Sequence, residues 1–467
     1  VIGSLVIHVI ALSLWVGGVI ALAFLSANDR PVAVPRFSQL ALWSAIAVVI
    51  SGAVNAWARL NFVDAWNSTY AFIVLGKIVA TIVLVFIGYL HRKTLAKKDS
   101  INWVGFAKLL TAEALIMVVT VLMGTWLSTS ASPDRPGSTE FSPALSIVGV
   151  ETPPPPTLSR ILFSYEPNAL MIGILTLMVA LYIKGVVVLS KRGDKWPVGR
   201  TIAFALGISA VDFATSGGLG LYAQFSFSYH MMSHMVLGMI APIGLVLGAP
   251  MTLALRTLPQ GRNPDERGVR GSLLAALHSK IGVLYTNPIV ALAIFDGSLF
   301  ALYFTDLFSI LMQSHIGHLF MSLHFLAAGF LFFFIIIGVD PNPRRVHHLV
   351  QIVILFAAMS IHAFFSVALM STTTLIDQGF YTSLQTPWLG DPLADQKLGG
   401  SIGWAMGEIP ILIALVATFI NWMRDDSREA KRIDRNTARQ AAMGQPDDLA
   451  NYNQYLQELS KRDRNEP

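Results

Sequence analysis

The chain has 467 residues, of which 54% are hydrophobic and only 13% charged, and its formal net charge at pH 7 is +5. A soluble domain carries about a quarter charged residues, so this composition excludes an ordinary soluble protein. The chain has no cysteine, which excludes disulfides, thiolate metal sites, iron–sulfur clusters and haem attached through Cys-x-x-Cys-His. The basic residues lie in short loops beside apolar segments, so the net charge does not indicate nucleic acid as a partner.

Continuous apolar runs recur along the chain, and a helix of about 20 such residues crosses the hydrocarbon core of a bilayer. The runs do not alternate apolar and polar residues, which favours helices over the strands of a β-barrel. We therefore predict an all-α, polytopic transmembrane helical bundle of about eleven helices in two bundles. The chain begins at Val1 inside an apolar segment, so we expect either a processed start or further helices upstream. The predicted spans are 1–25, 38–59, 70–90, 103–127, 168–190, 200–216, 229–250, 288–305, 315–338, 349–371 and 400–423.

The lysines and arginines between the spans are distributed unevenly over the two sides. One set of loops, together with the C-terminal tail, holds 26 of them, and the opposite set holds 4. Because basic loops stay in the cytoplasm, we expect the first set and the C-terminus to be cytoplasmic and Val1 to lie near the outer face.

The longest outer connection, 128–167, contains Ser132-Pro133-Asp134 and four consecutive prolines, 153–156. Such a composition predicts an extended, poorly packed linker. We therefore divide the chain into a four-helix membrane domain (1–127), this linker, a seven-helix membrane domain (168–423) and a charged tail (424–467). The tail has nine basic and nine acidic residues, which predicts a solvated helix followed by a loose end.

Histidines inside a membrane are costly and often mark function. Four of the eleven histidines fall in predicted cytoplasmic loops, where we expect them to be solvated: His91, His278, His347 and His348. The other seven fall within or at the edge of spans, in the outer half or near mid-depth by the predicted orientation: His8, His230, His234, His315, His318, His324 and His362. Their gathering at one depth predicts a metal site.

The densest group is His230-Met-Met-Ser-His234-Met235, at the start of the seventh predicted span. His230 and His234 lie one helical turn apart, about 40° around the helix, and Met231 and Met235 form the adjoining stripe. Two such imidazoles can bind one ion, and the thioethers favour soft Cu(I). The alternative is a helix-packing face, in which methionine fills space and histidine bonds to carbonyls.

The remaining candidate metal ligands lie on other spans. His315 and His318 share a helix face, whereas His324 points about 180° away from His315 and belongs to another surface or a transfer step. His362 and His8 are single histidines, each of which could instead be a structural hydrogen-bond partner. Four carboxylates also fall inside spans, and each could simply pair with a neighbouring helix: Glu113, Asp212, Asp296 and Glu408. Of these, we expect Asp296 and Glu408 to support the metal site or to bind protons.

No Walker A loop, dinucleotide fingerprint or His-Glu-x-x-His motif occurs, and no nucleophile stands at a motif spacing from a base. We therefore do not expect an enzyme.

Residues from about 165 to 423 resemble the cytochrome c oxidase assembly factor CtaG family. The matching pieces are His230-Met-Met-Ser-His234-Met, Ala241-Pro through Gly248-Ala-Pro250, His315-Ile-Gly-His318, Ser360-Ile-His362, and Asp395 through Trp404 followed by Gly407-Glu408. Residues 1 to about 127 resemble part of the copper resistance protein CopD family, through His8, Trp15-Val-Gly-Gly, Arg59 and Lys77.

These resemblances imply a multi-pass protein of the bacterial plasma membrane in which one half moves copper and the other delivers it to the copper centres of a terminal oxidase. They imply as partners the cytochrome c oxidase subunits or a respiratory supercomplex, and the lipid bilayer. The mechanism we expect is exchange of Cu(I) between His and Met donors. Two alternatives remain open at this point: a b-type haem protein that transfers electrons through paired histidines, and a metal-free scaffold for oxidase assembly.

Overall fold

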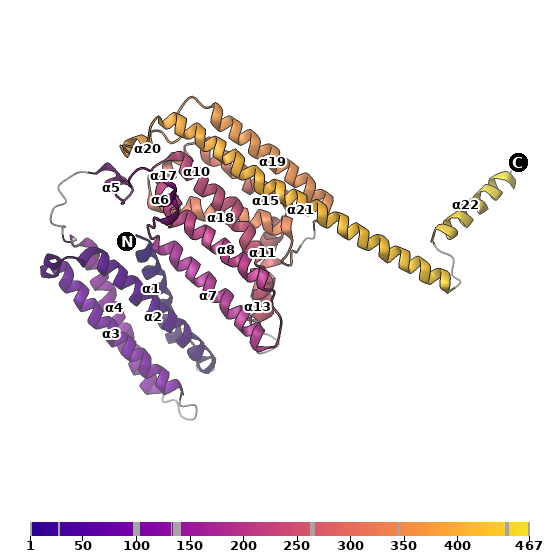
Figure 1. Ribbon diagram of the computed structural model, residues 1–467. Coiled ribbons are helices and arrows are strands. Elements are labelled where there is room, and N and C mark those ends of the chain that lie inside the picture. Colours follow the sequence, from indigo (N-terminus) through magenta and orange to yellow (C-terminus); the bar gives the residue numbers. More distant parts are fainter. Residues whose placement is uncertain are drawn as a thin grey trace.

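The computed structural model describes residues 2–26, 29–96, 103–131, 133, 142–261, 267–343, 346–443 and 448–465. These residues form helices and loops, with one isolated β-bridge between Tyr165 and Gly217. Ten of the described helical segments are long and apolar enough to cross a membrane (Figure 1). The predicted all-α polytopic fold is therefore confirmed. Several predicted loop residues lie outside the described ranges: Lys97, Lys98, Ser132, Asp134, Arg135, Arg262, Arg344 and Arg345.

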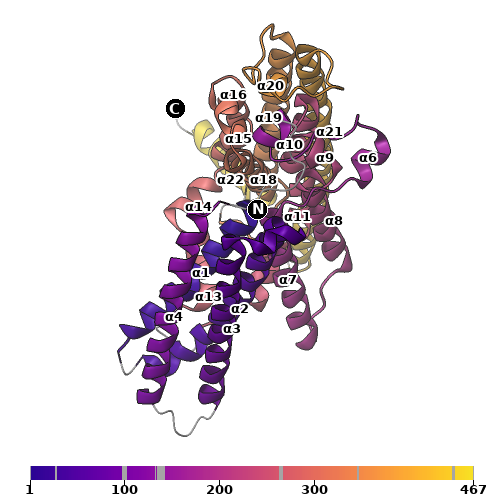
Figure 2. The ribbon, with the colours of Figure 1, turned by 90° about the vertical axis from the view of Figure 1, so that its left-hand side faces the viewer.

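The first bundle contains α1 (Ile2–Ala23), α2 (Arg30–Leu60), α3 (Thr69–Ala96) and α4 (Trp103–Thr129), with a 3-10 turn, η1 (Val63–Asn67), before α3. Its core includes buried Trp15, Val48, Leu84 and Met117. The bundle stands beside the rest of the protein and touches it through α1 and α7 (Figures 1 and 2).

His91 belongs to the core of this first bundle, so the prediction of a solvated loop residue is wrong. It lies near the end of α3 and is 7% exposed. Its Nε2 is 3.2 Å from Oε2 of Glu113 on α4, whose other carboxylate oxygen accepts a 3.3 Å hydrogen bond from Nε1 of Trp15 on α1. This pairing compensates for burying an imidazole and a carboxylate together.

The second bundle contains α7 (Ala169–Lys191), α8 (Val198–Thr215), α18 (His315–Ile337), α19 (His348–Ser371) and α21 (Pro392–Ala442). One further crossing is a composite of α10 (Phe227–Met235), a π-helical segment η2 (Val236–Ile240), α11 (Ala241–Leu247) and α12 (Pro250–Thr257). The shorter helices are α9 (Gly218–Tyr222), α13 (Gly268–Leu277), α14 (Lys280–Tyr285), α17 (Leu307–Met312) and α20 (Phe380–Ser383).

The predicted span 288–305 is not one continuous helix. It consists of α15 (Pro288–Phe295) and α16 (Gly297–Tyr303), which meet at the buried Asp296. α10 and α18 both begin at the same end of the bundle, since His230 and His318 lie together near their first turns. The chain between them must therefore return across the bundle, and the α15–α16 pair lies on that return path.

The second half of the 128–167 connection is folded onto the second bundle, which contradicts the predicted loose linker. It contains α5 (Pro143–Ile147) and α6 (Leu158–Phe163), and Ala144 is fully buried. The carbonyl of Pro153 accepts a 2.8 Å hydrogen bond from Nε1 of Trp388, and the carbonyl of Pro154 accepts one from the Tyr222 hydroxyl. These two hydrogen bonds fasten the proline run to the second bundle.

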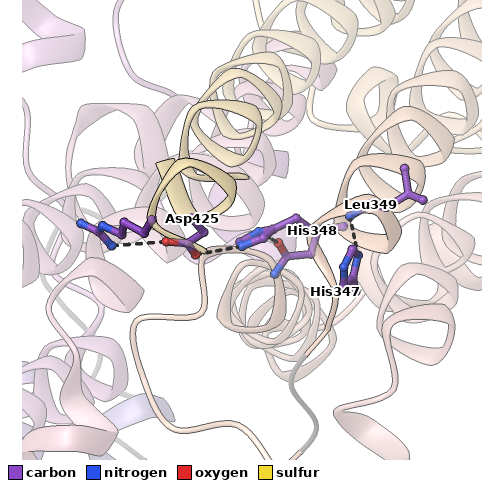
Figure 3. Close-up of polar contacts among 6 residues, drawn as sticks. His347, His348, Leu349 and Asp425 are labelled. Atoms are coloured by element: carbon purple, nitrogen blue, oxygen red, sulfur yellow. Dashed lines mark hydrogen bonds and ion pairs between the residues drawn. The ribbon is translucent and has the colours of Figure 1, made fainter. Parts of the chain in front are cut away.

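The charged tail continues a membrane-crossing helix rather than starting a new one. α21 runs without interruption into exposed residues beyond the bundle and is followed by α22 (Asp448–Asn465) (Figure 1). Where α21 leaves the bundle, Nε2 of His348 lies 3.2 Å from Oδ2 of Asp425 (Figure 3). The His347 Nδ1 next to it accepts a hydrogen bond from the Leu349 amide at the start of α19 (Figure 3).

Candidate metal centre

Three imidazoles from two helices converge inside the second bundle. His230 and His234 come from consecutive turns of α10, and His318 comes from the first turn of α18. One ring nitrogen from each of the three lies within 4.8 Å of the others. The ring centroids of His230 and His234 are 4.0 Å apart, and that of His318 is 5.4 Å from His230. We refer to these three residues as the three-His cluster.

A carboxylate from a distant helix fixes the start of α10. Asp395, in the first turn of α21, accepts hydrogen bonds from the hydroxyl of Ser226 at 3.0 Å and from the amides of Phe227 and Ser228 at 2.8 and 3.3 Å. The first amides of a helix have no partner within the helix, so this carboxylate satisfies them and complements the helix dipole. Asp395 therefore positions the turn that carries His230.

Two glycines bring α18 against the π-helical segment η2, which directly follows α10. η2 directly follows His234 and Met235, and Pro242, which has no amide hydrogen to donate, follows it. Within η2, the backbone of Gly238 touches that of Gly329 on α18 so closely that a Cβ at Gly329 would lie 2.0 Å from the Gly238 oxygen. Small residues permit such close helix approach, and π-helical turns often occur beside functional side chains.

Few of the imidazole nitrogens in the cluster have a hydrogen-bond partner in the protein. Nδ1 of His234 lies 3.0 Å from the hydroxyl of the buried Tyr303. The other nitrogen of His234 and both nitrogens of His230 are buried without a hydrogen-bond partner, and the two side chains are 1% and 0% exposed. An unsatisfied buried polar atom costs about 1–3 kcal/mol. These imidazoles therefore have free lone pairs at a point where a small cation would fit them.

Aromatic side chains enclose the cluster. The ring of Phe325 lies 4.3 Å from that of His234, and the ring of Phe308 lies 5.3 Å from that of His230. Phe227 packs against Phe308 and Tyr303. Rings in direct contact with the imidazoles exclude water, which strengthens electrostatic interactions at the site.

Two further predicted ligands on α18 lie outside this group. His315 is exposed one turn before His318, and its Nε2 approaches Gly149 of the folded connection. His324 is half-buried beside Phe320 and Phe325, and its Nε2 is buried without a partner. The structure thus separates the His315–His318 pair, with one ring at the cluster and one at the surface.

The predicted thioether ligands are buried in the helix contact beside the cluster. Met231 is fully buried, and its side chain packs against Gly403 of α21. Met235 is 2% exposed and belongs to the same hydrophobic core. Met231 therefore packs on α21, next to the face that carries His230 and His234.

The remaining predicted site residues lie in two other places. His362 on α19 is fully buried with its Nδ1 3.6 Å from Oδ1 of Asp296, and Glu408 lies nearby on α21. His8 lies in the first bundle, where its Nδ1 is 3.0 Å from the Ser51 hydroxyl and 3.1 Å from the Val48 carbonyl of α2. His8 therefore connects α1 to α2 and has no contact with the three-His cluster.

Sequence reasoning missed two residues of this site. Tyr303 carries no motif, and only its burial beside an intramembrane histidine identifies it. Asp395 belongs to the motif 395–404, but its role as the cap of α10 depends on a contact between residues 169 positions apart. No local pattern could have indicated either role.

Comparison with known proteins places this site within a family. Residues 180–425 match the family described as cytochrome c oxidase caa3 assembly factor (Caa3_CtaG), and residues 31–127 match copper resistance protein D. Uncharacterized proteins of Mycobacterium bovis and Mycobacterium tuberculosis are 42% identical over 318 residues, and one of Mycobacterium leprae is 41% identical over the same length. The match covers 68% of this chain and 48% of each relative, so the chain spans about half the length of the curated relatives it matches.

No solved structure matches the chain. The caa3 family match covers more than half of the 467 residues and includes every residue of the three-His cluster. This multi-pass membrane protein belongs to the cytochrome c oxidase caa3 assembly factor family and carries a copper resistance protein D segment before that domain.

Proposed function

We propose that this protein carries copper within the membrane and delivers it for assembly of the copper centres of cytochrome c oxidase. The observation that carries the proposal is the three-His cluster, in which both nitrogens of His230 and Nε2 of His234 are buried without a hydrogen bond of good geometry. The two family matches, one to an oxidase assembly factor and one to a copper resistance protein, support copper as the cargo.

The low charge of Cu(I) favours it as the ion that this cluster would hold. Three imidazoles are neutral when they act as ligands, so the cluster gains the full charge of whatever ion it holds. The cost of burying an ion rises with the square of its charge, which makes a monovalent ion far cheaper than a divalent one in this enclosed site. Imidazole binds copper well, and the chain has no thiolate to compete for it.

Transfer requires that the ion can leave, and the position of His315 suggests a route. His315 is exposed one turn from His318 on the same helix face. An ion could pass from His318 to His315 by exchange of one ligand at a time, with no chemical turnover. The buried sulfurs of Met231 and Met235 would stabilise the pocket wall from the adjoining stripe.

The setting we propose is the plasma membrane of a bacterium, with the C-terminus cytoplasmic and the cluster towards the outer side. The partners would be oxidase subunits or a respiratory supercomplex, and the first bundle would supply copper to the second. The haem alternative is less favoured, because Phe308 and Phe325 pack directly on the imidazoles where a flat macrocycle would have to enter.

The double substitution His230→Ala with His234→Ala tests this function. We expect it to lower Cu(I) bound to the purified protein and copper in the oxidase, while the protein itself accumulates normally. The matched control is His278→Ala, which removes an exposed histidine after α13. Oxidase copper and activity that stay unchanged in the double variant would contradict the proposal and favour a metal-free scaffold.

A further inference from the structure

The exposed imidazole of His315 meets the folded connection at a glycine. A Cβ added to Gly149 would lie 3.0 Å from Nε2 and 3.6 Å from Cε1 of His315. Apart from the chain neighbours of Gly149, no other atom of the described residues comes within 4 Å of that Cβ. Both residues are exposed, so the space beside Nε2 is open to solvent. The missing side chain of Gly149 therefore leaves room at this nitrogen.

The backbone of the connection is anchored on both sides of Gly149. Before it, Val148 is buried in the core of the second bundle. After it, the carbonyl of Pro153 accepts the 2.8 Å hydrogen bond from Trp388. Gly149 itself has a φ of +79°, and its amide donates a 3.1 Å hydrogen bond to the carbonyl of Leu145, which closes α5. The backbone at this position cannot move away from His315 without breaking these contacts.

The backbone of His315 is fixed as well. The hydroxyl of Ser314 caps α18 and accepts a 3.0 Å hydrogen bond from the amide of Gly317. A Cβ at Gly317 would clash with the carbonyl oxygen of Leu311, so α17 and α18 meet in a tight corner. With both backbones fixed, only rotation of the His315 side chain could relieve a clash with a side chain at position 149.

We propose that Gly149 is a positioning residue for release of the ion. Its missing side chain keeps Nε2 of His315 free to take the ion from His318 and to pass it to an incoming donor. This inference rests on the proposed function, because it concerns the ion that the three-His cluster would hold. A side chain at position 149 would turn the imidazole away or cover Nε2. It would slow transfer and leave the affinity of the cluster unchanged, because it meets only His315.

The test compares Gly149→Ala with Gly193→Ala in the full chain. Gly193 has a φ of +78°, and a Cβ there would have no atom within 4 Å, so this control carries the same backbone strain without touching His315. Each purified protein is loaded with Cu(I), and transfer to a chromogenic Cu(I) chelator is followed by stopped-flow absorbance. Equilibrium competition with the same chelator measures the affinity separately.

We expect Gly149→Ala to transfer Cu(I) more slowly than Gly193→Ala by about tenfold, because crowding a fixed contact raises a barrier enough to change a rate by that factor. The equilibrium affinities of the two variants should be equal.

The variant His315→Ala connects this effect to the imidazole. Alone, it should slow transfer, because the ion then leaves His318 without an intermediate ligand. Adding Gly149→Ala to it should cause no further slowing, because no ring remains to be displaced. His315 is exposed, so its removal opens no cavity, and His315→Ala tests the exit even if Gly149→Ala does not fold.

The inference is overturned if Gly149→Ala transfers Cu(I) as fast as Gly193→Ala, or if His315→Ala transfers it at the parent rate. It is also overturned if Gly149→Ala slows transfer equally without His315, or lowers the equilibrium affinity below that of Gly193→Ala. A parent protein that binds no Cu(I) would contradict the proposed function and this inference together. Cu(I) bound by every variant and transferred at equal rates would contradict this inference alone.

Discussion

Tyr303 favours one tautomer of His234 and so sets which nitrogen would be free to hold the proposed ion. Its hydroxyl lies 3.0 Å from Nδ1, and both side chains are buried. When Nδ1–H donates to this oxygen, Nε2 keeps its lone pair. Outer partners of this kind hold a ligating imidazole in one tautomer and one orientation, and raise its basicity.

Tyr303→Phe should therefore weaken Cu(I) binding by about 10- to 100-fold with little loss of fold, since only one hydroxyl is removed. Competition with a chromogenic Cu(I) chelator measures the affinity. Tyr182→Phe is the matched control, because that buried hydroxyl donates a 2.9 Å hydrogen bond to the Gly248 carbonyl, which is not part of the cluster. Equal affinities in the two variants would remove Tyr303 from the site.

Among the elements, α10 depends most on a distant partner. Its first turn carries His230, and its first amides are satisfied by Asp395 of α21. Gln396, beside it, is 1% exposed and bonds the backbone of Ile376 and Thr374. These two consecutive residues fasten the start of α10 and the loop after α19 to the same end of α21.

Asp395→Ala should lower the free energy of unfolding by about 2–3 kcal/mol, because charge-assisted hydrogen bonds to buried donors are lost. Thermal unfolding in detergent should show a lower Tm, and Cu(I) affinity should fall with it as His230 loses its fixed position. Asp426→Ala, an exposed carboxylate on the same helix, should leave both unchanged. A wild-type Tm in the Asp395 variant would show that α10 begins correctly without this cap.

In the molecule as a whole, two bundles join along one helix contact. Gly3 of α1 lies against Leu170 of α7, and Ile7 lies against Gly173. The exposed apolar side chains on both bundles are suited to contact with lipid. The orientation of the protein across the membrane therefore depends on its charged loops.

The chain has no cysteine, so a single introduced thiol can report on which side of the membrane a given residue lies. Ser383→Cys and Ser427→Cys each introduce one thiol at an exposed position, on α20 and on the tail part of α21. In intact cells a membrane-impermeant maleimide should label the first variant and leave the second unlabelled until the cells are broken. The reverse pattern would invert the predicted topology and place the three-His cluster towards the cytoplasm.

The fold class, most of the spans and the residue types of the candidate site could be predicted from local patterns in the chain. Hydropathy and the spacing of His230 and His234 are local properties of the chain, and helix geometry converts them directly into length and face. The same reasoning predicted His91 in solvent, because a histidine beside basic residues looks like a loop residue until Glu113 is known to face it.

Which imidazoles meet could not be predicted in this way, because it depends on how the helices pack against one another. The rotation and depth of α10 relative to α18 depend on the Gly238–Gly329 contact, the π-helical segment and the Asp395 cap, which join residues far apart in the chain. These contacts bring His318 to the cluster, leave His315 at the surface and place His362 opposite Asp296. Side-chain convergence is a property of packing between helices, and the pattern along one helix does not contain it.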